Sequence, residues 1–226
     1  MIIKRIVGRM LPRGVRDSLI NYRILSREFG QYRSIASGQS IDRAGMPIPW
    51  YSYPAIEYIR QLDFSDKAVF EYGSGNSTLF WAARSKSVVA VEDDHAWYER
   101  VRQSLPDHVE YLLKPAKDDY VSAISNVAGP FDVIIIDGSH RYDCAVAALP
   151  HLASDGFVIL DNSDWKTKTS QLLRDADLIE VDMSGFGPIN GYTTTTSFYF
   201  TRSVILRPAG PRQPMHGIGS VPHLEE

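Results

Sequence analysis

The sequence is poor in cysteine and has no long apolar run. Its 226 residues include a single cysteine, Cys144, which excludes an intramolecular disulfide framework and a metal site built from several thiolates. Such cysteine usage is typical of a reducing compartment, and we expect a cytoplasmic protein. No segment reaches the roughly 20 apolar residues of a membrane-spanning helix. The N-terminus lacks the apolar stretch of a secretory signal.

The sequence also lacks a large excess of charge of either sign. It has 24 basic and 27 acidic residues, for a net charge of -3, and this balance gives no general attraction to nucleic acid or to membranes. No basic stripe runs through the segment that we expect to be catalytic, so we expect no nucleic-acid partner. Internal repeats and heptad patterns are absent as well.

The first ten residues combine apolar and basic side chains at helical spacing. The apolar members are Ile2, Ile3, Ile6, Val7 and Met10. One interpretation is a helix that packs on the domain or on the partner in a homodimer. The other is a helix that makes weak contact with a membrane surface. We favour the first interpretation.

Most of the chain alternates between strand-like and helix-like segments. Apolar runs rich in valine and isoleucine, separated by amphipathic stretches, predict a parallel sheet covered on both faces. We expect strands at 68–73, 88–93, 109–114, 131–137, 156–161, 178–183 and 195–201. We expect helices from about Pro54 and at 77–85, 95–105, 118–127, 142–153 and 167–176. No helix separates the last two strands, which predicts an antiparallel hairpin at the edge of the sheet.

These patterns divide the chain into three parts. Residues 1–49 form a helical N-terminal extension, and residues 50–206 form an α/β domain. Residues 207–226 are rich in proline and glycine, and we expect an extended or disordered tail.

The sequence EYGSGNST, residues 71–78, joins the first expected strand to a helix. Ligands of open α/β sheets bind at this end of the strands, and Gly73 and Gly75 allow close approach of the backbone. The third glycine of the dinucleotide fingerprint is missing, which argues against a pyrophosphate. Glu71 would repel phosphate and attract an ammonium group, and Glu92, at the end of the second strand, can accept both hydroxyl protons of a ribose. A ligand with a ribose, an ammonium group and no phosphate is S-adenosylmethionine.

FEYGSGNST and VVAVEDD resemble motif I and the acidic strand of the class I S-adenosylmethionine-dependent methyltransferases. The resemblance covers roughly residues 50–202 and implies a Rossmann-like sheet of order 3-2-1-4-5-7-6. It also implies that Asp118 or Asp119 meets the adenine amino group, although helix capping is an equally good role for that pair. The full set of expected cofactor-binding residues is Glu71, Gly73, Ser74, Gly75, Asn76, Ser77, Glu92, Asp93, Asp118 and Asp137.

Polar residues also follow the fourth and fifth expected strands. FDVIIIDGSH ends with Asp137 and His140, and GFVILDNSDW contains Asp161 and Asn162. Two carboxylates and an amide oxygen suit Mg²⁺, which could lower the pKa of a bound hydroxyl group. His140 is a candidate general base beside Asp137. Each of these residues could instead serve the loops structurally.

The pattern Asp137, Asp161 and Asn162 is similar to that of the metal-dependent catechol and caffeoyl-coenzyme A O-methyltransferases. His140 stands where those enzymes have a catalytic lysine, and an aspartate followed by this histidine looks more like the sugar O-methyltransferases related to macrocin O-methyltransferase. The resemblance therefore implies a sugar, glycan or secondary-metabolite hydroxyl as the acceptor. By position, Trp50, Tyr51 and Tyr53 could cover the site, and residues 185–196 could wall the acceptor pocket.

We therefore expect an enzyme that transfers a methyl group from S-adenosylmethionine to a hydroxyl oxygen. One alternative is an aminopropyltransferase of the same fold, with Asp137, Asp161 and Asp164 binding a polyamine. Another is a non-catalytic partner subunit that retains the cofactor fold. A nicotinamide-dependent oxidoreductase is disfavoured by Glu71 and by the missing third glycine.

Overall fold

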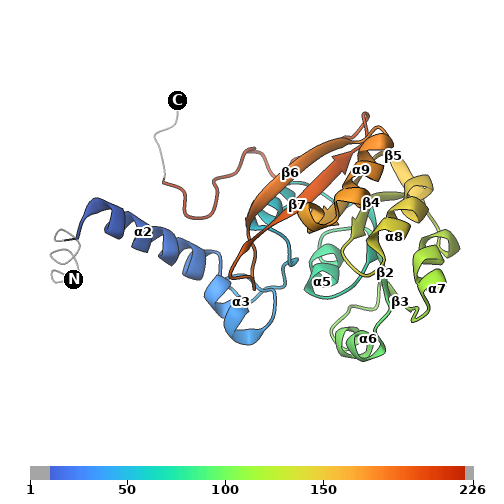
Figure 1. Ribbon diagram of the computed structural model, residues 1–226, viewed down its shortest axis with the longest axis horizontal. Helices are drawn as coiled ribbons and strands as arrows, with labels where there is room; N and C mark the ends of the chain where they lie inside the picture. The colour runs from blue at the N-terminus through green and yellow to red at the C-terminus, as the bar shows by residue number, and fades with distance from the viewer. Residues whose placement is uncertain (1–10, 222–226) are drawn as a thin grey trace.

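The computed structural model describes residues 11–221 and has a seven-stranded sheet at its centre (Figure 1). The strand order is β3-β2-β1-β4-β5-β7-β6, as the sequence resemblance implies. Strand β7 is antiparallel to both of its neighbours, and the other pairs are parallel. The strands are β1 (Ala68–Tyr72), β2 (Ser87–Glu92), β3 (Val109–Leu113), β4 (Phe131–Ile136), β5 (Leu152–Asp161), β6 (Ile179–Phe186) and β7 (Thr193–Phe200).

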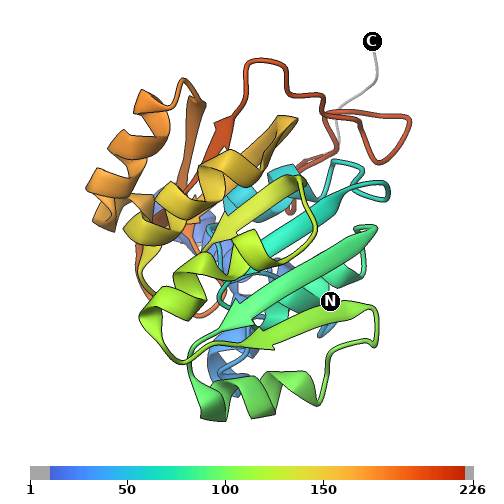
Figure 2. The same cartoon turned by 90° about the vertical axis from the view of Figure 1, so that its right-hand side faces the viewer.

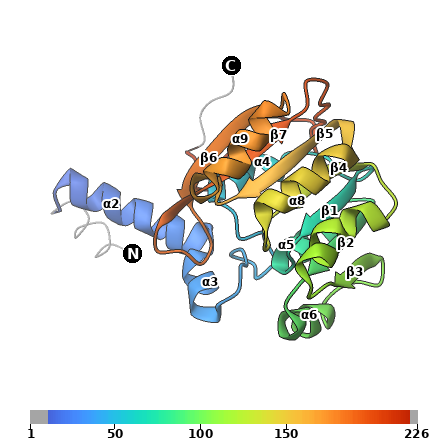
Figure 3. The ribbon, with the colours of Figure 1, turned by 45° about the vertical axis from the view of Figure 1, so that its right-hand side comes forward.

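Helices cover both faces of this sheet. On β4, Val133 and Ile135 belong to one core cluster, and Ile134 and Ile136 belong to the other, because successive side chains point to opposite faces. The first cluster joins the sheet to α4 (Tyr53–Ile59) and α5 (Asn76–Ala82). The second joins it to α7 (Lys117–Val121), α8 (Arg141–Ala148) and α9 (Thr167–Asp175), and Figures 2 and 3 show α8 and α9 over the same face. Helix α6 (His95–Arg102) packs beside β2 and β3.

Two of the expected helices are shorter than predicted because their last residues form 3-10 turns instead of α-helix. The expected helix 118–127 is α7 followed by a 3-10 turn, Ser122–Asn126, and the expected helix 142–153 ends in a 3-10 turn, Leu149–His151. Strand β5 begins four residues earlier than expected, at Leu152. None of these differences moves the carboxyl ends of the strands, where the site lies.

Two extensions flank the α/β domain. The first comprises α2 (Arg13–Arg23), a π-helical turn η1 (Ile24–Glu28) and α3 (Gln31–Ser37), and α2 projects away from the sheet (Figure 1). The apolar helix that we expected within residues 2–10 lies outside the described residues. At the other end, residues 207–221 form no helix or named strand. This segment lies beside the residues that follow α4, and Ala209 donates its N–H to the Gln61 carbonyl at 2.7 Å.

Within residues 11–221, no helix is long and apolar enough to cross a membrane.

Candidate functional site

A cavity of about 590 Å³ opens at the carboxyl ends of β1, β4 and β5. Its walls come from the loop after β1, from α6, from the segment between α3 and α4, and from the loop between β6 and β7. Asp137 and Asp161, which follow or end β4 and β5, line it between these walls. This is the position at which open α/β sheets bind their ligands.

The glycine loop after β1 lies very close to the loop after β4. Gly73 has a φ of +96°, and a Cβ atom there would lie 3.0 Å from the backbone nitrogen of Gly138. Gly75 has a φ of +153° and donates its N–H to the Thr78 hydroxyl at 3.0 Å. A side chain at Gly73 would therefore force the two loops apart and strain the backbone.

Glu71 is the most deeply buried acid beside this loop, with 1% of its surface exposed. Its Oε2 accepts a hydrogen bond from the Thr78 hydroxyl at 2.5 Å, whereas its Oε1 has no partner in the structure. Burial raises the pKa of Glu71 to about 8; the Ser77 and Thr78 side chains oppose this rise, and the nearby charges of Asp137 and Glu92 add to it. An unpartnered buried carboxylate oxygen is costly, and a cationic ligand group would relieve that cost.

Glu92 ends β2 and is fixed in one orientation. Its Oε1 accepts the backbone N–H groups of Asp93 and Asp94, both at 3.0 Å, and its Oε2 accepts the Ser74 hydroxyl at 2.6 Å. The Ser74 hydroxyl also lies 2.7 Å from the hydroxyl of Tyr111. Burial raises the pKa of Glu92, and these hydrogen bonds oppose that effect. The carboxylate is thus held next to the glycine loop before any ligand arrives.

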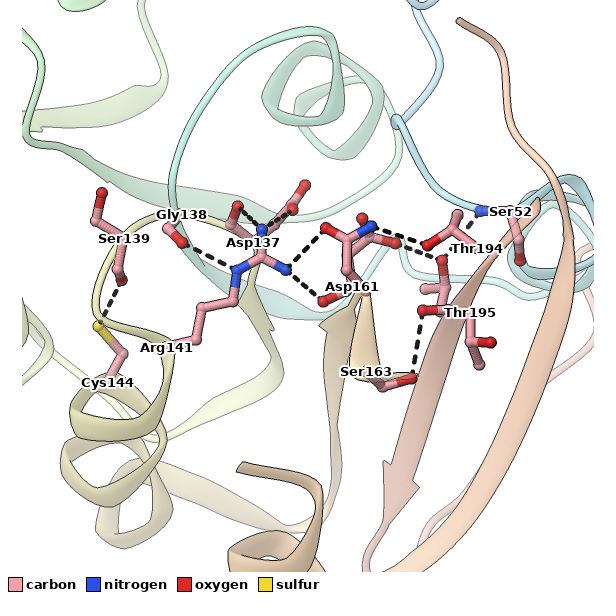
Figure 4. A network of polar contacts seen from close by, with 12 residues as sticks. Ser52, Asp137, Gly138, Ser139, Arg141, Cys144, Asp161, Ser163, Thr194 and Thr195 are labelled. Carbon is pink, nitrogen blue, oxygen red and sulfur yellow. Dashed lines mark hydrogen bonds and ion pairs between the residues drawn. The ribbon is translucent and has the colours of Figure 1, made fainter. Parts of the chain in front are cut away.

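Arg141 joins the ends of β4 and β5 through all five of its N–H groups (Figure 4). It donates to the carboxylate Oδ1 of Asp137 at 3.0 Å and to the side-chain oxygen of Asn162 at 3.2 Å. Three carbonyl oxygens take its other hydrogen bonds, and they belong to Asp137, Gly138 and Asp161. Because a guanidinium has five donors, Arg141 has none left for a ligand.

This arrangement does not fit the predicted Mg²⁺ site. A cation already contacts side-chain oxygens of Asp137 and Asn162, two of the three expected ligands. The remaining one, Asp161, accepts the Thr196 hydroxyl on its Oδ1 at 2.5 Å. Among residues 11–221, no three His, Cys, Asp or Glu side chains are grouped so that they could hold a metal ion. The sequence pattern could not show that a neighbouring arginine turns into this space.

Asp137 and Asp161 form a pair of carboxyl groups on the cavity wall. Burial raises the pKa of Asp161 well above its usual value, and the charge of Asp137 raises it further. Burial also raises the pKa of Asp137, while the ion pair with Arg141 lowers it. Both groups would ionise more readily next to a positively charged ligand.

Residues 70–163 match the family model of a methyltransferase domain. The fold, with β7 antiparallel between β5 and β6, is that of the class I enzymes. Over residues 70–163 the chain is therefore similar in sequence to a methyltransferase domain, and its sheet has the Rossmann-like fold seen in solved methyltransferase structures.

Solved structures with this fold include precorrin-6y C5,15-methyltransferase from Geobacter metallireducens GS-15. It is 14% identical, has a TM-score of 0.54, and the match covers 66% of this chain and 87% of that one. Cofactor-bound Rv0187 from MTB is 21% identical with a TM-score of 0.51, over 60% of this chain and 73% of that one. No curated protein matches the sequence significantly.

The α/β domain places most of the expected cofactor residues together, but not all of them. Ser74, Gly75, Asn76, Ser77 and Asp137 line the cavity. Gly73 lies between Ser74 and the end of β1, and Glu71 and Glu92 contact residues of the loop through Thr78 and Ser74. Asp93 follows Glu92, whose carboxylate accepts its N–H.

His140 and Asp118 lie outside the residues that line the cavity. His140 adopts a left-handed conformation, with φ 51°, at the start of α8. Its side chain is exposed, with the ring centroid 6.3 Å from that of Tyr120. Asp118 and Asp119 are exposed in the first turn of α7. The structure therefore does not place His140 among the residues that line the cavity with Asp137 and Asp161.

The cavity also has an aromatic wall that was only partly predicted. Trp50, Trp97 and Trp165 line the cavity and are 40–57% exposed, and Tyr192 joins them. The expected walls at Trp50 and within 185–196 are present, whereas Tyr51 and Tyr53 are buried in the core. Trp97, Trp165 and Arg141 were missed, and their only signal was their position just after strand ends.

Proposed function

We propose that the protein transfers the methyl group of S-adenosylmethionine to a hydroxyl oxygen of a small molecule, such as a sugar, glycan or secondary metabolite. The observation that carries this proposal is the unpartnered, buried Oε1 of Glu71 beside the glycine loop. The family match at residues 70–163 supports it. When bound, S-adenosylmethionine would supply an activated methyl group on a sulfonium.

We assign a group of the chain to each part of the cofactor. The Glu71 carboxylate would offset the charge of the ammonium group. The Glu92 carboxylate, with Asp93 next to it, would accept the ribose hydroxyl protons. The backbone of Gly73, Ser74 and Gly75 leaves room for close approach. Asp118, exposed in the first turn of α7, remains our candidate for the adenine amino group.

The acceptor would lie against the aromatic wall. Three of the four tryptophans in the sequence line this cavity with large exposed faces. Such faces pack well against the C–H faces of sugar rings, and aromatic side chains with a few convergent polar groups are typical of small-molecule sites. The amide of Asn190, which accepts the Trp50 indole N–H at 2.8 Å, fixes one side of this wall.

Catalysis would rest on positioning the hydroxyl group in line with the methyl group. The acceptor hydroxyl needs to lose its proton, and Asp161 is better placed for this than His140 because it lines the cavity. The positive charge of the cofactor would lower the raised pKa of Asp161 and so favour its ionised form. Arg141, which pairs with Asp137, also lowers the pKa of Asp161 and would support its ionised form.

Aminopropyl transfer is less well supported by the same geometry. A polyamine would need a strongly acidic pocket, but Arg141 already neutralises Asp137. The expectation of a metal-assisted reaction is likewise replaced by one that depends on the protein's own carboxylates.

Calorimetry with S-adenosylmethionine tests the cofactor assignment. We expect the wild-type protein to bind it and Glu92→Gln to bind about tenfold or more weakly, because a charged hydrogen-bonding partner is lost. A matched control is Glu110→Gln on β3, since Glu110 is exposed and does not line the cavity. Wild-type protein that does not bind the cofactor, or Glu92→Gln that binds as the control does, would contradict the assignment. Turnover with a panel of sugars and phenols then tests the acceptor.

A further inference from the structure

Helix α2 extends from the domain without burying any of its residues. None of its 11 residues is buried, and Figure 1 shows it pointing away from the sheet. The residues that follow its C-terminal end anchor it to the domain. Leu25 and Phe29 pack against the core, and the centroid of the Phe29 ring lies 4.5 Å from that of Tyr53. The helix is therefore held at one end and exposed along its length.

One face of α2 is apolar. Val15, Leu19 and Tyr22 are spaced by four and three positions, which places them on the same side of a helix. They are 47%, 53% and 64% exposed. Such side chains in a row have no evident function in the described fold, since none of them belongs to its two core clusters.

One side of this face is basic. Arg16 and Arg23, seven positions apart, follow one edge of the stripe, and the only acid of α2, Asp17, is paired with Arg13 and Arg16. Residues 1–28 hold seven basic and two acidic residues, which leaves 17 basic and 25 acidic residues for the rest of the chain. The small net charge of the whole chain conceals this separation.

We propose that α2 docks on the surface of a membrane that contains anionic phospholipids. Val15, Leu19 and Tyr22 would enter the boundary between headgroups and acyl chains, and the arginines would contact the lipid phosphates. A second copy of the chain is a poorer partner for this face. Two such helices packed together would bring their arginines close to one another, and like charges disfavour that contact. This proposal is independent of the methyl-transfer reaction.

Co-sedimentation of the full chain with vesicles tests the proposal without cofactor or acceptor. We expect binding to vesicles with about 30% phosphatidylserine and at least tenfold weaker binding to pure phosphatidylcholine. Leu19→Gln should weaken binding to the anionic vesicles by about tenfold. Ile20→Gln is the matched control, because Ile20 is 48% exposed but points away from the stripe. Arg16→Gln with Arg23→Gln should weaken binding and reduce its salt dependence.

Three results would overturn the proposal. One is an absence of binding to anionic vesicles, and another is equal loss of binding in the Leu19 and Ile20 variants. The third is a wild-type dimer in sedimentation velocity that Leu19→Gln converts to a monomer, with no lipid binding by either, which would assign the face to a second copy.

Discussion

Burial of Glu71 links cofactor binding to protons at the scale of one residue. Its pKa is raised to about 8 by burial, so the free protein is largely protonated there at neutral pH. A cationic cofactor requires the carboxylate, and binding should release a proton and weaken as the pH falls below about 8. The loss should approach tenfold per pH unit for this group.

Titration calorimetry at pH 6 to 9, in buffers of different ionisation enthalpy, measures this linkage. Glu71→Gln should release about one proton fewer per cofactor bound, since the carboxyl group is gone. Asp137 and Asp161 also have raised pKa values, so a smaller pH dependence should remain. Identical proton release in the wild type and the variant would show that Glu71 does not face the cofactor.

Arg141 offers a second prediction for a single residue. If its guanidinium takes the place of a metal ion, activity should be unchanged by EDTA. Arg141→Met should lower kcat/KM on the order of 100-fold, because the ends of β4 and β5 lose their link. It should also shift the pH–rate profile to higher pH, since Asp137 loses the cation that lowers its pKa. Arg141→Lys keeps the charge but not the fork of donors, and should rescue the pH profile more than the rate. Activity that chelation abolishes and Mg²⁺ restores would contradict this prediction.

At the scale of elements, the strands were predictable and the turns after them were not. Apolar runs such as FDVIII fix buried strands because a parallel sheet is covered on both faces. The order of the strands came from the family resemblance and is confirmed. The direction of a side chain just after a strand depends on the conformation of the turn that follows. For this reason His140 lies outside the cavity lining, whereas the next residue, Arg141, lines the cavity. The division at residues 50 and 206, the homodimer and the cytoplasmic location remain predictions.

The loops that follow β1 and β4 lie so close together at Gly73 and Gly138 that a side chain at either glycine should destabilise the fold. A Cβ at Gly138 would lie 2.8 Å from the backbone nitrogen of Gly73 and would also strike the Tyr120 hydroxyl. Gly138→Ala should therefore lower the free energy of unfolding by about 1–3 kcal/mol. Gly210→Ala is the control, since a Cβ there meets nothing within 4 Å. Equal midpoints for both variants in urea unfolding would show that the two loops separate easily.

At the scale of the whole molecule, α2 should contribute nothing to the stability of the domain. A helix of 11 residues with no buried side chain is marginal by itself in water, so its folding should be uncoupled from that of the core. Ser18→Pro breaks the interior of α2 and should leave the Tm unchanged within about 1 °C. Leu25→Ala, in the anchoring turn that packs against the core, should lower the Tm by about 3–6 °C.

Scanning calorimetry gives both Tm values, and far-UV circular dichroism confirms that Ser18→Pro loses helix. A large fall in Tm for Ser18→Pro would mean that α2 is covered in solution, and it would favour a second copy as its partner. If Ser18→Pro keeps its Tm but no longer binds vesicles, then membrane binding by α2 is separate from the stability of the α/β domain. The sequence of α2 would then be explained by what it contacts outside the protein, because Val15, Leu19 and Tyr22 take no part in the core of residues 11–221.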